Sequence, residues 1–131
     1  MIVVDASALS AILLREEGWK NLAPYITSAV APDHVVKEVA NTIWKAMRAG
    51  MLAEQDAQKA FDLLLCMINR NLALEPETEH LGKAFEISVT HGVTVYDALY
   101  IALALEKNLP LLTLDKVQRK IAEKMGVQVK P

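Results

Sequence analysis

Short apolar runs alternate along this chain with longer segments that have helical periodicity. Five runs have strand character because they are brief, rich in β-branched or leucine residues, and bounded by breakers such as Pro and Gly: 2–4, 28–31, 72–74, 110–114 and 127–129. Strands that are apolar throughout are buried on both faces, which is typical of a parallel sheet covered by helices. The alternation therefore predicts an α/β protein with a parallel sheet and helices on both of its faces.

The segments between these runs fit helices of ordinary length. We expect helices over 8–14, 19–26, 34–48, 54–69, 78–91, 94–108 and 117–124. Within the third of them, Val35, Val39 and Ile43 recur at the helical period, and Asp33 is placed to cap its start. In the helix over 54–69, the larger apolar residues Phe61, Leu64, Leu65 and Ile68 are expected to form the buried side. Gly92 is expected to end the helix that precedes it.

Composition narrows the class of protein. The chain has 131 residues, 53% of them hydrophobic, which favours one globular domain over residues 1–131. No apolar stretch approaches the ~20 residues that span a bilayer, and the N-terminus lacks the basic region of a signal peptide, so a cytoplasmic protein is expected. The single Cys66 excludes an internal disulfide and is expected to be a buried helical thiol. The net charge of −2 does not by itself indicate a nucleic-acid partner.

Four acids occupy positions where a charge is unfavourable. Asp5 and Asp115 each end an apolar run, Asp97 opens the apolar stretch 98–105, and Glu38 interrupts the helical segment 35–39. Because the carboxyl ends of parallel strands share one edge of the sheet, Asp5 and Asp115 are expected at that edge, with Glu38 and Asp97 able to approach it. Converging carboxylates repel each other, so they persist best around a divalent cation, and oxygen ligands favour Mg²⁺ or Mn²⁺ over zinc.

Each acid also has an ordinary structural explanation. Asp5 (or Ser7) and Asp115 can cap the helices that follow them, and Thr94 with Asp97 fits a capping box. Glu38 can lie on a solvated helix face that also carries Asn41. The sequence leaves these explanations open beside the metal-site hypothesis.

Other chemistries lack the residues that they require. The three histidines, His34, His80 and His91, have no spacing that indicates a zinc site, and no Cys–His pair is present. The five glycines are isolated, which excludes a Walker loop and a dinucleotide-binding fingerprint. A receiver-like signalling domain would need a second acid beside Asp5, where Ala6 and Ser7 follow instead.

Four segments, in order, resemble the PIN domain. They are Ile-Val-Val-Asp-Ala-Ser over 2–7, Glu-Val-Ala-Asn over 38–41, Val-Tyr-Asp-Ala-Leu-Tyr-Ile-Ala-Leu-Ala over 95–104, and Leu-Thr-Leu-Asp over 112–115. The length and order resemble the small VapC-type toxins of toxin–antitoxin pairs. The resemblance implies a three-layer α/β/α sandwich and a Mg²⁺- or Mn²⁺-dependent ribonuclease. It assigns the acidic site to Asp5, Glu38, Asp97 and Asp115, with Ser7, Asn41 and Thr113 as supporting polar residues.

The same resemblance implies partners and leaves one rival function. An RNA substrate, a cognate antitoxin that inserts into the site and a homodimer are expected, with no membrane association. Where some members of the family carry a further acid, this chain has Lys116, Val117 and Gln118, so only one metal position is well supplied with ligands. The rival is a catalytically inactive PIN-fold module that regulates or binds RNA, in which the acids serve only as caps.

Overall fold

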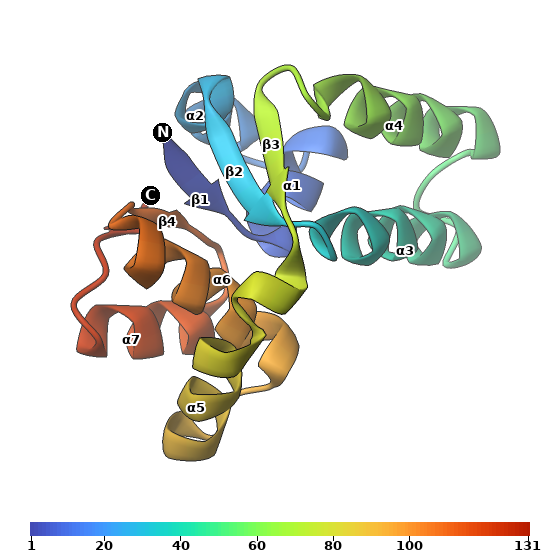
Figure 1. The fold of residues 1–131 in the computed structure, drawn as a ribbon. Helices are drawn as coiled ribbons and strands as arrows, with labels where there is room; N and C mark the ends of the chain where they lie inside the picture. Colours follow the sequence, from blue (N-terminus) through green and yellow to red (C-terminus); the bar gives the residue numbers. More distant parts are fainter.

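A parallel sheet of five strands forms the centre of the molecule, as the sequence predicts (Figure 1). The structure, a computed structural model, describes residues 1–131. In space the strands follow the order β3 (Leu72–Glu75), β2 (Ala29–Pro32), β1 (Ile2–Val4), β4 (Leu111–Leu112) and β5 (Val129–Lys130). Every neighbouring pair is parallel. The N-terminal strand is therefore the central one.

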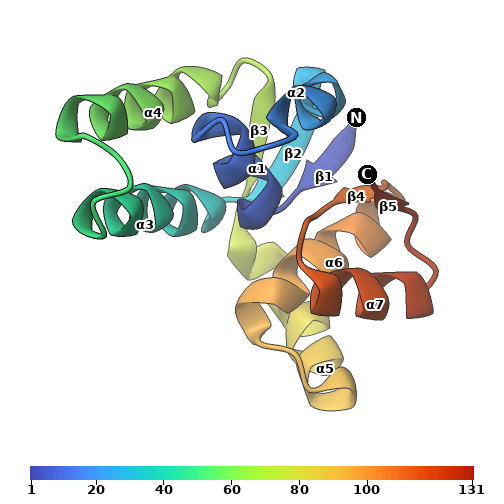
Figure 2. The same ribbon diagram turned by 180° about the vertical axis from the view of Figure 1, so that it is seen from behind.

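Helices flank this sheet in two groups and complete the predicted α/β/α sandwich (Figure 2). The first group packs together early in the chain: α1 (Ala6–Leu13), α2 (Trp19–Leu22), α3 (Val35–Arg48) and α4 (Glu54–Met67). The second group packs around the most apolar helix: α5 (Leu81–His91), α6 (Val95–Lys107) and α7 (Lys116–Lys124). Two short 3₁₀ turns, η1 (Ala23–Thr27) and η2 (Glu77–Glu79), lie beside β2 and after β3.

The strand order reverses between β1 and β4, and this reversal positions the site. Successive strands run from β1 outward through β2 to β3, and the chain then returns to place β4 on the other side of β1. Val4 pairs with Leu112, so the residues that follow them, Asp5 and Thr113, leave the sheet side by side. The Asp5 amide donates to the Leu112 carbonyl at 3.1 Å. Ligand sites of open α/β sheets form at the carboxyl ends of strands where the order reverses.

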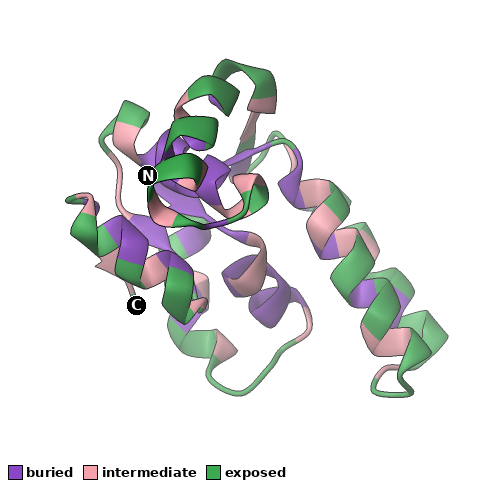
Figure 3. Ribbon diagram, turned by 90° about the horizontal axis from the view of Figure 1, so that it is seen from below, coloured by how far each residue is buried: buried purple, intermediate pink, exposed green.

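Helix α6 is the main contact between the sheet and the second helical group. It packs against β1, β2 and β4, and all of its residues from Ala98 to Ala104 are buried. Buried residues gather in the strands and the inner helix faces (Figure 3). No single helix is long and apolar enough to cross a membrane, although the bent pair α5–α6 passes that test by length and composition.

Helices α3 and α4 form an antiparallel hairpin that extends away from the sheet (Figure 1). The residues of α4 that are buried are Ala57, Ala60, Leu64 and Met67. The predicted buried side was therefore partly wrong, because Leu65 is 47% exposed. Cys66 is also exposed, which corrects the expectation of a buried thiol.

Three local predictions differ from the structure. The helix expected over 19–26 is α2 followed by η1, which has Pro24 near its start and non-helical angles at Ile26. The helix expected over 78–91 begins only at Leu81, after η2. Asp33 does not cap α3, because its Oδ1 accepts instead from the Glu77 amide at 3.1 Å. This bond ties the start of α3 to η2.

Candidate functional site

A polar hollow of about 410 Å³ lies at the carboxyl edge of β1 and β4. We call it the acidic pocket, and its lining residues are Asp5, Ala6, Ser7, Ser10, Glu16, Glu38, Thr42, Asp97, Tyr100, Leu114 and Asp115. All four acids that the sequence singled out line this one hollow, together with Glu16. The lining contains no Lys, Arg or His, and the one histidine that contacts a pocket acid, His34 beside Glu38, lies outside the lining.

The Asp5 carboxylate is held by hydrogen bonds from the start of α1 and from the end of β4. Its Oδ1 accepts from the Ala8 amide at 2.9 Å and so caps α1. Ser7 Oγ donates to the same carboxylate at 2.7 Å, and Thr113 donates to Oδ2. The residue is only 2% exposed, and this burial raises its pKa from 3.8 to about 6 despite the three hydrogen bonds, with a further contribution from the charge of Asp115. Capping and pocket lining are therefore compatible in one residue.

The end of β4 supplies the polar support for Asp5. Thr113 is fully buried, and its Oγ1 also accepts from the Asp115 amide at 3.0 Å. Ser7 Oγ accepts from the Leu114 amide at 3.0 Å, which joins the start of α1 to the loop after β4. Asp115 caps α7 by accepting from the Gln118 amide at 2.8 Å, and it also lines the pocket. Ser7 and Thr113 thus hold Asp5 and the β4 loop in place.

Asp97 lies in the first turn of α6, half-buried at the pocket wall. Its amide donates to Thr94 Oγ1 at 3.2 Å, the capping arrangement that the sequence indicates. Burial raises the pKa of Asp97, and the charges of Asp115 and Glu38 raise it further. Like charges shift the pKa of a carboxylate only when they lie close to it. Asp97, Asp115 and Glu38 therefore lie near one another, although they come from three different helix starts.

Glu38 has partners that the other acids lack. The Tyr100 hydroxyl donates to Glu38 Oε1 at 2.9 Å, and Nε2 of His34 lies 2.8 Å from the same oxygen. Burial alone would raise the pKa of Glu38, but these two contacts outweigh it and lower the pKa. Burial and the nearby carboxylates raise the pKa of the Tyr100 hydroxyl far above its ordinary range, which keeps it a proton donor.

Sequence reasoning missed Tyr100 and His34 as partners of Glu38. A polar hydroxyl within an otherwise apolar helix and a histidine four residues before an acid were the available hints. Asn41, a predicted supporting residue, is exposed and does not line the pocket. Thr42 lines it instead, and its hydroxyl donates to the Glu38 carbonyl at 3.0 Å.

The donor set of the acidic pocket fits a hard divalent cation. Its charged groups are all carboxylates, flanked by hydroxyl groups from Ser7, Ser10 and Thr42, which are the oxygen ligands that Mg²⁺ and Mn²⁺ prefer. Burial and repulsion from nearby carboxylates raise the pKa values of Asp5 and Asp97. A bound cation would offset both effects, because it favours the ionised form of each carboxylate. Asp5, Glu38, Asp97 and Asp115 are the residues that could hold it.

A second carboxylate group lies elsewhere, at the end of β3. Ligand atoms of Glu75, Glu79 and His80 all lie within 4.8 Å of one another. We call these three residues the β3 cluster. Lys107 Nζ lies 3.1 Å from Glu75 Oε1, so this cluster already contains a cation of the chain.

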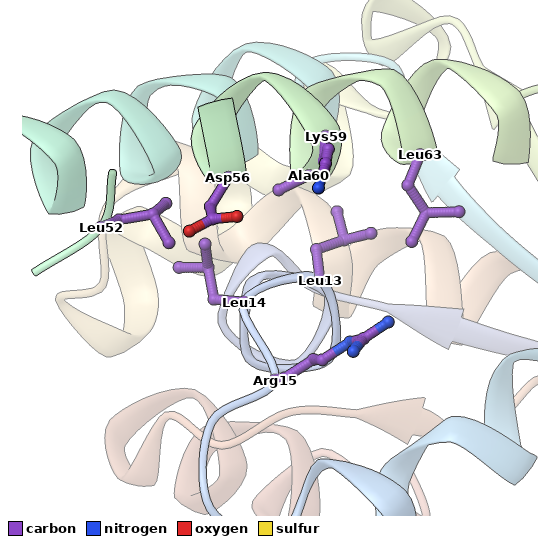
Figure 4. Close-up of a pocket in the computed structure, with 8 residues that line it drawn as sticks. All are labelled: Leu13, Leu14, Arg15, Leu52, Asp56, Lys59, Ala60 and Leu63. Atoms are coloured by element: carbon purple, nitrogen blue, oxygen red, sulfur yellow. The ribbon is translucent and has the colours of Figure 1, made fainter. Parts of the chain in front are cut away.

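A hollow of about 360 Å³ between α1 and α4 has a different character (Figure 4). Its walls are mainly apolar and come from Leu13, Leu14, Leu52, Ala60 and Leu63. Arg15, Asp56 and Lys59 stand at its edges, and none of the predicted site residues reaches it. This hollow has a single acid with two basic residues beside it, so it lacks the group of carboxylates that a metal requires, and the acidic pocket is the candidate site.

Comparison with known proteins places the chain beside a nuclease family. The family model described as "PIN domain" matches residues 2–124. Ribonuclease VapC3 of Pyrobaculum aerophilum is 38% identical over 99% of this chain and 98% of its own length. Ribonuclease VapC1 of Mycobacterium tuberculosis is 34% identical over 86% of this chain and 80% of its own.

Solved structures show the same fold at lower identity. PAE2754 from Pyrobaculum aerophilum superposes with a TM-score of 0.74 at 23% identity, covering 98% of this chain and 87% of that one. FitAcB from Neisseria gonorrhoeae superposes with a TM-score of 0.63 at 17% identity, covering all of this chain and 97% of that one.

Proposed function

The chain belongs to the PIN-domain family and is of the VapC type, and from this premise we propose that it is a Mg²⁺- or Mn²⁺-dependent endoribonuclease. The observation that carries the proposal is the acidic pocket, which gathers five acids and contains no Lys, Arg or His. A module that uses its acids only as helix caps would have no reason to gather Asp5, Asp97 and Asp115 in one hollow without a basic side chain to pair with them. The relatives that are named ribonucleases support the choice of RNA as the substrate.

Asp5, Glu38, Asp97 and Asp115 would hold the cation. The chemistry that such a cation would supply there is a water molecule of lowered pKa and a polarised phosphodiester. The chain contributes orientation: Ser7 and Thr113 fix the Asp5 carboxylate, and Tyr100 fixes Glu38. Groups that orient metal ligands in this way are typically worth about 10–100-fold in affinity or activity.

Basic side chains outside the pocket are suited to the RNA backbone. Helix α7 carries Lys116, Lys120 and Lys124 along one hollow beside the end of α5. Helix α7 starts directly after Asp115, so the row of lysines begins beside the acidic pocket and runs from there along the helix. We assign them to phosphate contacts, which supply affinity without sequence preference and weaken as salt increases.

Two protein partners complete the proposal. An antitoxin that inserts a basic side chain into the acidic pocket would supply the cation that the lining lacks, and would thereby block the site. A second copy of the chain would cover the outer face of α5, where Phe85 and Val89 lie four residues apart and are 61% and 71% exposed. We place the protein, as an enzyme acting on cellular RNA, in the cytoplasm.

A metal-dependent cleavage assay tests the central proposal. The chelated protein should not cleave single-stranded RNA, and Mg²⁺ or Mn²⁺ should restore cleavage. Asp97→Asn should abolish cleavage while leaving the circular dichroism spectrum unchanged, because the substitution removes charge with little change of shape. Glu79→Gln, an acid of the β3 cluster, is the matched control and should cleave normally. Full activity of purified Asp97→Asn would reject the assignment.

A further inference from the structure

A second hollow, of about 480 Å³, shares a wall with the acidic pocket. Glu38 lines both spaces, so the two hollows are neighbours on the two sides of its side chain. Its lining is His34, Lys37, Glu38, Glu77, Leu81, Val95, Tyr96 and Leu99. The volume lies within the range of about 300–1,000 Å³ that is usual for small-molecule sites. We call this hollow the side pocket.

Tyr96 gives the side pocket an aromatic surface. The residue is 64% exposed although it stands at the start of the most buried helix, directly before Asp97. Its ring centroid lies 6.0 Å from that of His34 at an interplanar angle of 50°. His34 in turn lies 4.9 Å from the Tyr100 ring, which is buried. The Tyr96 ring is thus supported from beneath and presented to solvent, the arrangement that stacks an unpaired base.

The remaining lining suits the other parts of a nucleotide. Leu81, Val95 and Leu99 supply apolar contacts to a flat base. Lys37 provides a cation for a backbone phosphate at the edge of the pocket. The carboxylate of Glu77, 38% exposed, can accept from the amino group of a base, as carboxylates do when they read base edges.

We propose that the side pocket binds one unpaired nucleobase of the RNA strand whose phosphate lies in the acidic pocket. The base stacks on Tyr96, and its amino group is directed to Glu77, which disfavours uracil at this position because uracil has no amino group. The inference rests on the proposed ribonuclease function and adds to it a determinant of where the strand is cut.

Kinetics on a short single-stranded RNA with one mapped cleavage site test this inference. Stacking of one base on an aromatic side chain corresponds to about 5- to 150-fold in binding, so Tyr96→Ala should raise KM by at least about fivefold and affect kcat much less. Tyr96→Phe retains the ring and should restore KM toward the wild-type value. Tyr25→Ala, the same truncation in η1 beside the opposite end of the sheet, should leave both constants unchanged.

A binding readout separates this inference from the proposed function. RNA carrying 2-aminopurine beside the cleavage site should lose fluorescence on binding to Asp97→Asn, and should not lose it with the double variant Asp97→Asn/Tyr96→Ala. If wild type cleaves but Tyr96→Ala has unchanged KM and unchanged quenching, the side pocket is rejected and the ribonuclease stands. If wild type does not cleave but quenching depends on Tyr96, the base site stands and the enzymatic proposal falls.

Discussion

The acidic pocket and the β3 cluster both gather carboxylates, but they balance the charge in opposite ways. In the β3 cluster, Lys107 binds Glu75 and lowers its pKa, and the His80 ring lies between Glu75 and Glu106 at 3.2 Å and 3.1 Å. In the acidic pocket only Glu38 has such a partner, in His34, and the pKa values of Asp5 and Asp97 are raised instead. The β3 cluster has the closer ligand atoms, yet its Glu75 is already paired with Lys107 and His80. The absence of a basic side chain beside buried carboxylates, rather than short distances between acids, indicates which group requires a cation from solution.

The largest expected effect is on cation affinity in the acidic pocket. Asp115→Asn removes one carboxylate charge, while the amide oxygen can still cap α7. We expect the dissociation constant for Mn²⁺, measured by calorimetry, to rise by more than about 100-fold, because loss of a direct ligand should exceed the 10–100-fold effect of an orienting residue.

Asp33→Asn provides the matched control for this measurement. Asp33 also accepts from a backbone amide, that of Glu77, but it lies outside the acidic pocket. Its substitution should leave Mn²⁺ affinity unchanged. Equal losses in the two variants would mean that the cation does not bind in the acidic pocket.

The second effect is on stability as a function of pH in the absence of metal. Burial raises the pKa of Asp5 from 3.8 to about 6, so the folded protein binds this proton more tightly than the unfolded chain does. The resulting stabilisation is complete below about pH 4 and is lost as the pH rises through 6. The contribution of Asp5 to the free energy of unfolding should therefore fall by on the order of 2 kcal/mol between pH 4 and 7.

Urea unfolding in EDTA at several pH values measures this slope. Asp5→Asn cannot titrate, so its free energy of unfolding should fall less between pH 4 and 7 than that of wild type. Saturating Mn²⁺ should stabilise wild type at pH 7 by about 2.7 kcal/mol at 100 times the dissociation constant, and should stabilise Asp5→Asn much less. A wild-type slope identical to that of Asp5→Asn would show that the buried carboxyl is not the titrating group.

A smaller effect is expected in the β3 cluster. His80 is buried and contacts two carboxylates, so His80→Gln should reduce the free energy of unfolding by about 1.5 kcal/mol, the lower range for hydrogen bonds to charged groups. Chemical denaturation measures the loss of stability. In the RNA cleavage assay, the folded His80→Gln protein should be as active as wild type. Impaired cleavage in a folded His80→Gln protein would contradict the assignment of catalysis to the acidic pocket alone.

The smallest effect is expected at Lys107. Its side chain is 46% exposed, and ion pairs of this kind contribute at most about 1 kcal/mol. Lys107→Met should lower the midpoint of thermal unfolding slightly at low salt, and the difference from wild type should shrink in 1 M NaCl because salt screens exposed charges. A salt-independent loss would indicate a packing role for the side chain instead.

The position of the site at the sheet edge could be predicted from sequence because it depends only on the order and direction of the strands. Short apolar runs that alternate with helices specify parallel strands, and parallel strands place Asp5 and the end of β4 at a common edge. The same reasoning did not separate capping from pocket lining, and the structure shows that Asp5 and Asp115 do both. The cap of α7 uses only Oδ1 of Asp115, so one residue can cap a helix and present its other carboxylate oxygen to the pocket.

Contacts between helices could not be predicted in this way. The bond between Tyr100 and Glu38 depends on how α6 lies against α3, which hydrophobic periodicity does not specify. The buried side of α4 was misjudged for a related reason. Its core-facing positions include Ala57 and Ala60, and such small side chains are weaker hydrophobic markers than Leu65, which is exposed.

The contact between Asp5 and Thr113 joins residues 108 positions apart and has a consequence for protein synthesis. Asp5 emerges from the ribosome long before its neighbouring strand β4 and the acid Asp115 have been translated. At about 5–20 residues per second, the growing chain spends several seconds without a complete site. The acidic pocket of a nascent chain is therefore incomplete until β4 and Asp115 have also left the ribosome, however early Asp5 has done so.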